Sequence, residues 1–141
     1  GADGVQMASR FVCTEECDAS DAFKQAYLDC SREDIGLVMS PAGLPGRAIK
    51  KNIDQIRQRD VDLGVRCPSG CLKKCSYKVG QERFCIVHAL ARAQRGDVET
   101  GLVFCGTNAW KADRITTVRA IFEELFAGEE AVVLPEVAVN G

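Results

Sequence analysis

The sequence opens with GADGVQMASRF, residues Gly1 to Phe11, which indicates a glycine-rich turn running into a buried strand. Strand-forming residues recur from Val5 to Val12, so we predict one strand there. The small residues Ala8 and Ser9 would leave backbone N–H groups open to an anion. One strand does not make a sheet, and the first residue is glycine rather than methionine. We therefore expect the chain to be an excised piece of a longer protein.

Helical spacing of apolar residues dominates much of the remaining chain. Ser20 is a good N-cap for a helix that continues to Cys30. A second helical pattern runs from Phe84 to Arg95, and Gly96 fits the position of its C-terminal cap. The strongest pattern covers Asp113 to Ala127, with Asp113 placed to act as the N-cap. These patterns predict a protein with more helix than sheet.

Shorter apolar runs lie between the helical patterns. Asp34 to Ser40 is one such run and predicts a strand. Prolines and glycines at positions 41, 43, 45 and 46 then favour a loop. From Arg47 to Asp60 a narrow apolar stripe predicts a surface helix. Leu102 to Cys105 is a further apolar run, bounded by glycine on both sides.

Length and composition limit the class of protein. The chain has 141 residues, 46% of them hydrophobic, which is enough for one domain with a real core. We place that domain at residues 1–130 and expect a disordered tail or a non-native extension over 131–141. No apolar run approaches the roughly 20 residues that a membrane span needs. No signal peptide opens the chain, so we expect a cytoplasmic protein.

Four of the eight cysteines fall within what we call the cysteine-rich loop, residues 66–85. They are Cys67, Cys71, Cys75 and Cys85. Thiolates are soft ligands that suit zinc or an iron–sulfur cluster, and four of them complete either coordination shell. We therefore predict a Zn²⁺ or 4Fe–4S site at these residues. The alternative is a set of buried or unligated thiols, because free cysteine packs as a small hydrophobe.

Composition disfavours two other uses of this region. Disulfides are disfavoured because there is no signal peptide and the chain has the apolar periodicity of an ordinary core. Between Arg47 and Arg83 there are ten Lys or Arg and four Asp or Glu, against eight and sixteen elsewhere. The chain as a whole lacks the basicity and the interleaved aromatics of nucleic-acid-binding modules. We therefore interpret the basic segment as a solvated face.

Three separated segments carry a resemblance to a known family. They are Gly1–Phe11, Ser40–Ile49 (SPAGLPGRAI) and Arg95–Ala109 (RGDVETGLVFCGTNA). In this order they resemble the C-terminal portion of the nitronate monooxygenase family, also called 2-nitropropane dioxygenase-like or NAD(P)H-dependent flavin oxidoreductases. The resemblance extends to about Phe126, and the segment Phe84–Ile86 is similar to a cysteine-containing subset of the family.

The resemblance implies an FMN-dependent enzyme built on a TIM barrel, which oxidises alkyl nitronates or passes electrons from NAD(P)H through flavin to an acceptor. It implies that Gly1–Phe11 is the last barrel strand. Gln6, Ala8 and Ser9 would then contact FMN, with the backbone of Ala8 and Ser9 at the phosphate. The family more often has Gly-Thr at these two positions. A full barrel needs about 250 residues, so the remainder of the barrel and the family's catalytic histidine would precede Gly1.

Isolated polar residues carry weaker signals. His88 does not match the family's catalytic position, and we interpret it as a packed or surface histidine, with a general base or a metal ligand as the alternatives. Arg47 could meet a phosphate, but a structural salt bridge is favoured. Asn108 could orient a ligand, although asparagine in such a loop more often bonds the local backbone. Cys13 and Cys17 are interpreted as ordinary thiols.

Together these inferences predict a helix-dominated α+β fragment, comprising the last strand and the C-terminal region of a TIM-barrel flavoprotein. In the parent protein we expect a small-molecule substrate and NAD(P)H, with no membrane partner. We assign no catalytic residue to this chain and expect no turnover from it alone. The alternative is a stand-alone zinc or iron–sulfur module, in which the basic segment docks a partner protein or nucleic acid.

Overall fold

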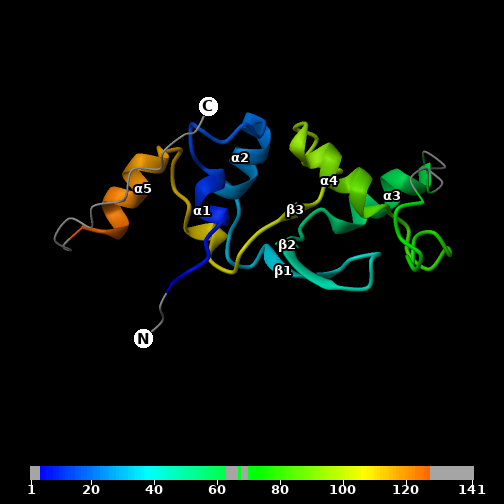
Figure 1. Ribbon diagram of the computed structural model, residues 1–141. Coiled ribbons are helices and arrows are strands. Elements are labelled where there is room, and N and C mark those ends of the chain that lie inside the picture. Colours follow the sequence, from blue (N-terminus) through cyan, green and yellow to red (C-terminus); the bar gives the residue numbers. More distant parts are fainter. Residues whose placement is uncertain (1–3, 63–66, 68–69, 128–141) are drawn as a thin grey trace, which may run out of the picture.

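Helices and a small antiparallel sheet make up the fold. The computed structural model describes residues 4–62, 67 and 70–127. In chain order the elements are α1 (Ser9–Val12), α2 (Asp21–Leu28), β1 (Ile35–Met39), β2 (Pro45–Ile49), α3 (Ile53–Asp62), α4 (Ile86–Gln94), β3 (Val103–Phe104), the 3-10 helix η1 (Ala109–Lys111) and α5 (Val118–Leu125). Figure 1 shows α1, α2 and α5 at one end and α3 and α4 at the other, with the strands between them. The mixture of helices with a small sheet agrees with the predicted α+β class.

The opening segment is not the strand that the sequence predicts. Residues 4–8 have no regular structure, and Ser9–Val12 form α1. Val5 is 80% exposed. A strand gains its stability by pairing with a neighbour, and among the described residues the sheet consists of β1, β2 and β3 alone. The prediction of a buried strand over Val5–Val12 is therefore wrong in this structure, and the described part of the implied last barrel strand, residues 4–11, is not a strand.

Helix α2 begins where the sequence predicts. The backbone N–H of Phe23 donates to Ser20 Oγ at 3.3 Å, which is the expected N-cap contact. Near the other end of the helix Tyr27 is buried. Its hydroxyl donates to the carbonyl of Phe104 at 2.5 Å. This bond fixes α2 against β3.

The sheet is an antiparallel hairpin with a third strand added to it. β1 confirms the strand predicted within Asp34–Ser40, whereas β2 occupies residues predicted as a loop and a helix start. Ile49 pairs with Ile35 on one side and with Val103 on the other. Because β2 gains backbone hydrogen bonds on both edges, pairing overrides the helical spacing that begins at Arg47. The helix predicted from Arg47 instead begins at Ile53 as α3.

The sequence predicts the ends of the two later helices with different accuracy. Gly96 follows α4 with φ of +102° and donates its N–H to the carbonyl of Ala93 at 3.0 Å, as predicted for a C-terminal cap. α5 begins at Val118, and its N-cap is Thr117, whose hydroxyl accepts from the N–H of Ala120 at 3.1 Å. The prediction of Asp113 as N-cap is wrong, because the chain before Thr117 is held extended by pairing with residues near Thr14.

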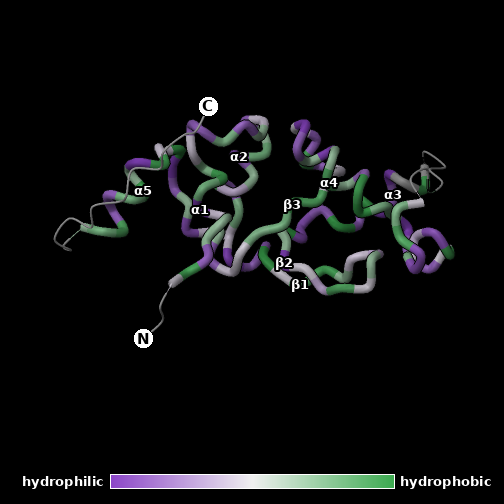
Figure 2. Tube along the Cα trace, viewed as in Figure 1, coloured by the Kyte–Doolittle hydropathy of each residue, from purple (hydrophilic) through white to green (hydrophobic). Residues whose placement is uncertain are grey.

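Two clusters of buried side chains form the core. The thiol cluster contains Cys13, Tyr27, Cys30, Ile49, Ala93, Val103 and Ala109. The Phe84 cluster contains Val38, Ala48, Ile56, Phe84, Ala89 and Leu102. Figure 2 shows β3, which adjoins both clusters, coloured as hydrophobic, while α5 alternates hydrophobic and hydrophilic residues. No helix in the described part of the chain is long and apolar enough to cross a membrane. The predicted tail, 131–141, lies outside the described residues.

Candidate functional site

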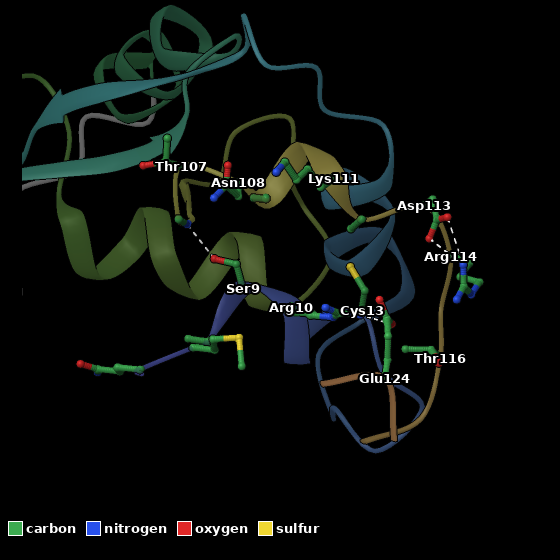
Figure 3. Close-up of a pocket in the computed structure, with 16 residues that line it drawn as sticks. Ser9, Arg10, Cys13, Thr107, Asn108, Lys111, Asp113, Arg114, Thr116 and Glu124 are labelled. Carbon is green, nitrogen blue, oxygen red and sulfur yellow. Dashed lines mark hydrogen bonds and ion pairs between the residues drawn. The ribbon is translucent and has the colours of Figure 1, made fainter. Parts of the chain in front are cut away.

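A pocket of about 680 Å³ lies between segments that are far apart in the sequence. One wall comes from residues 6–10 and 13. The other wall comes from residues 106–109, 111–114 and 116, with Glu124 of α5 (Figure 3). The predicted cofactor contacts Gln6, Ala8 and Ser9 therefore share one cavity with Asn108.

A hydrogen bond joins the two walls of the pocket. The backbone N–H of Gly106 donates to Ser9 Oγ at 2.6 Å, drawn as a dashed line in Figure 3. A Cβ added at Gly106 would lie 3.2 Å from that same oxygen, which is tighter than ordinary contact. Glycine at this position therefore permits the close approach of the two segments. With Ala8 beside it, the corner of the pocket at Ser9 is lined by small side chains.

Backbone pairing holds the walls together at a second point. The N–H of Thr116 donates to the carbonyl of Cys13 at 3.0 Å, and the N–H of Glu15 donates to the carbonyl of Thr116 at 2.9 Å. The buried ammonium of Lys24 donates to the carbonyl of Thr14 at 2.7 Å. This part of the site is therefore fixed by contacts from α2 as well as from the segment before α5.

Charged side chains on the pocket wall are mostly neutralised by neighbours. Arg10 forms an ion pair with Glu124. Arg114 pairs with Asp113 at 3.1 Å. Lys111 instead places its ammonium 5.7 Å from the centre of the Trp110 ring. Because the two carboxylates of the lining both pair with arginines, the wall carries one net positive charge, at Lys111.

The thiols near the pocket are not activated. Cys13 lines the pocket but is only 2% exposed, and burial raises its pKa. Burial also raises the pKa of Cys105 to about 11. Thiols with raised pKa values stay protonated at neutral pH and are poor nucleophiles. This agrees with the interpretation of Cys13 as an ordinary thiol.

The structure does not gather the predicted metal ligands into a site. Cys71 is exposed, Cys67 and Cys75 are half-buried, and Cys85 is buried at the start of α4. Across residues 4–62, 67 and 70–127, no group of three or more His, Cys, Asp or Glu side chains could hold a metal ion. The part of the loop around Ser76 is instead held by backbone bonds, including one from its N–H to the carbonyl of Pro41 at 2.9 Å. The predicted zinc or iron–sulfur site has no support here.

The remaining predicted residues divide between the pocket and the surface. His88 is half-buried on α4, and Arg47 is exposed on β2. Neither lines the pocket, whereas Asn108 does. Sequence reasoning missed the contributions of Arg10 and Lys111. The available signal for Lys111 was its position two residues after the Gly-Thr-Asn-Ala loop.

The pocket residues all lie within a stretch that matches a known family. Residues 1–128 match the family described as nitronate monooxygenase. The chain belongs to the nitronate monooxygenase family. Family membership confirms the resemblance carried by the three separated segments. No curated protein sequence matched the chain.

Solved structures agree with the place of this chain in the nitronate monooxygenase family. FabK from Thermotoga maritima is 25% identical, with a TM-score of 0.65, over 90% of this chain and 37% of FabK. A mutant of that FabK is also 25% identical, with a TM-score of 0.62, over 90% of this chain and 34% of its own. The chain thus spans little more than a third of the length of these structures.

Proposed function

We propose that the chain is the C-terminal segment of an FMN-dependent oxidoreductase that oxidises alkyl nitronates or transfers electrons from NAD(P)H through flavin. Membership of the nitronate monooxygenase family supports flavin-dependent oxidation and reduction in general. One observation carries the proposal: the pocket brings Gln6, Ala8 and Ser9 against the loop that contains Asn108. In the proposed parent, the rest of a TIM barrel supplies the other contacts to flavin and to substrate.

The corner of the pocket at Ser9 fits a phosphate group. The small side chain of Ala8 lines this corner, and glycine at position 106 lets the Ser9 hydroxyl approach the backbone there. Ser9 and Thr107 carry hydroxyl groups, and Asn108 carries an amide, so several hydrogen-bond donors face one cavity. The net charge of the wall is positive. These properties match the phosphate of FMN, which a flavoprotein must hold by positioning contacts.

The described residues have binding roles in this proposal. Ser9 Oγ accepts from Gly106, so its own hydrogen is available to a phosphate oxygen. The amide of Asn108 is placed to donate on the opposite wall. When bound, FMN supplies the electron transfer itself. No described residue of the pocket combines a lowered pKa with a nucleophilic group, so we assign these side chains to binding rather than to chemistry.

Flavin titration tests the proposal. FMN is titrated into this chain and into a longer polypeptide that restores the upstream part of the parent, with quenching of flavin fluorescence as the readout. We expect the longer polypeptide to bind FMN tightly. We expect turnover of an alkyl nitronate or NAD(P)H by the longer polypeptide and not by this chain. The substitution Ser9→Val should weaken FMN binding about tenfold, while Ser31→Val, at an exposed serine outside the pocket, should not. Failure of both polypeptides to bind FMN would remove the assignment.

A further inference from the structure

We propose that Lys111 determines the preference of this pocket for phosphorylated flavin over flavin that lacks a phosphate. The inference rests on the proposed function and adds to it one specificity-determining residue. It begins from the charges on the pocket wall, because these separate Lys111 from the two arginines.

The charges on the pocket wall differ in whether they already have a partner. Arg10 and Arg114 each have a carboxylate partner, Glu124 and Asp113. An incoming anion would have to compete with those carboxylates for the two guanidinium groups. Among the described residues Lys111 has no carboxylate within ion-pair distance, and its recorded neighbour is the indole of Trp110. Lys111 is therefore the cation of the wall that can take a new anionic partner without breaking an existing pair.

The backbone of Lys111 is held in place by its neighbours in the fold. It is the last residue of η1, whose first residue, Ala109, is buried in the thiol cluster. The N–H of Lys111 donates to the carbonyl of Asn108 at 3.1 Å, which fixes the turn between them. Figure 3 shows the amine of Lys111 extending from η1 toward Asn108. The backbone of Lys111 is thus anchored, while its long side chain can move to contact a ligand.

The charge of the ligand distinguishes the two flavins. Riboflavin and FMN share the same ring system and differ by a phosphate, which carries negative charge at neutral pH. An ammonium group is a compact point charge with three donors, well suited to a phosphate oxygen. Loss of Lys111 should therefore weaken FMN binding and leave riboflavin binding nearly unchanged. A residue that only supports the fold would weaken both.

The experiment compares Lys111→Gln and Lys111→Arg with Lys74→Gln, which removes the same charge at an exposed position outside the pocket. Dissociation constants for FMN and riboflavin are measured by fluorescence quenching on the longer polypeptide. Inorganic phosphate is titrated into the 141-residue chain, with the amide resonances of Gly106 and Asn108 as the readout. We expect Lys111→Gln to weaken FMN and phosphate binding about tenfold. Lys111→Arg should restore most of the affinity, and Lys74→Gln should change neither constant.

The outcomes separate the two proposals. If FMN and riboflavin lose affinity equally in Lys111→Gln, or if FMN binds the variant as well as the wild type, the role of Lys111 is overturned while the flavin function stands. If no flavin binds but phosphate shifts Gly106 and Asn108 in a manner that depends on Lys111, the flavin function fails and the anion site stands. If phosphate leaves those resonances unchanged in the wild type, the role of Lys111 is overturned.

Discussion

The thiol cluster and the cysteine-rich loop use the same side chain in opposite ways. Cys13 and Cys30 lie buried in one cluster, and Cys105, which is far from both in the sequence, packs against it. The cysteines of the loop span a stretch of sequence about as long as that from Cys13 to Cys30, but in the described residues they form no metal-binding group. The difference shows that packing, rather than spacing along the chain, decides which thiols meet. In the thiol cluster cysteine acts as a small hydrophobe.

The two core clusters lie on opposite faces of one sheet. Ala48 and Ile49 are consecutive in β2, yet Ala48 belongs to the Phe84 cluster and Ile49 to the thiol cluster. Leu102 and Val103 divide in the same way. Successive side chains of a strand point to opposite faces, so this alternation is expected.

The largest effect should come from Phe84, which is fully buried in the Phe84 cluster. Phe84→Ala should lower the free energy of unfolding by about 3–5 kcal/mol, because it removes an aromatic ring and leaves a cavity. Urea denaturation followed by circular dichroism measures the change. Val87→Ala, at a site that is 45% exposed, serves as the control and should cost about 0.5 kcal/mol or less. A loss below 1 kcal/mol at Phe84 would contradict the described packing.

The next effect should come from Asn52, which links the start of α3 to the segment before β3. Its side-chain nitrogen donates to the carbonyl of Val98 at 2.5 Å and lies 3.1 Å from those of Glu99 and Gly101. Asn52→Ala should cost about 2 kcal/mol, because these carbonyls lose a donor where water has little access. Gln55→Ala, on the exposed face of α3, is the matched control in urea denaturation. Equal midpoints for the two variants would show that Asn52 does not join these segments.

A smaller effect is expected where α5 attaches to the pocket side of the molecule. Thr117→Ala removes the N-cap contact to Ala120 and should cost about 1 kcal/mol. The loss should appear first as faster hydrogen exchange at the amide of Ala120. Thr117→Ser retains the hydroxyl and should retain the protection. Unchanged exchange in Thr117→Ala would mean that the carboxylate of Glu16, which accepts from the N–H of Val118, is sufficient to cap the helix.

The last effect should appear only at alkaline pH, through the half-buried Cys105. Burial raises the pKa of this thiol to about 11, from an ordinary value of 9.0. The folded state therefore favours the protonated thiol. Its contribution to stability is full below pH 9 and is lost as the pH rises toward 11. Denaturation midpoints measured from pH 8 to 10.5 should fall, and Cys105→Ala should make the fall shallower. An identical slope in the variant would contradict the raised pKa.

Local signals predicted the parts of the fold that depend on neighbouring residues. The cap at Ser20, the strand after Asp34 and the glycine after α4 were predictable because each is decided within a few positions. The sequence predicted Asp113 as the cap of α5, but pairing of Thr116 with residues near Thr14 keeps the preceding chain extended, and Thr117 is the cap. The strand predicted at the N-terminus was wrong because pairing depends on distant residues.

The candidate site was predictable only in pieces. Ser9 and Asn108 were each recognised as possible ligand contacts, but nothing in the sequence places them in one cavity. The bond from Gly106 to Ser9 spans 97 positions. The charge balance that singles out Lys111 depends on pairs such as Arg10 with Glu124, 114 positions apart, which only the folded chain reveals.

The bond between Ser9 and Gly106 also has a consequence for the order of assembly. Proteins are synthesised from the N-terminus, so Ser9 leaves the ribosome long before its partner exists. The α2 helix and the β1–β2 hairpin can form while the rest is still being translated, because their contacts are short in range. The cavity must wait until translation has passed Glu124, which lines it. A nascent chain stalled before that residue would already contain α2 and the β1–β2 hairpin but would lack the binding site.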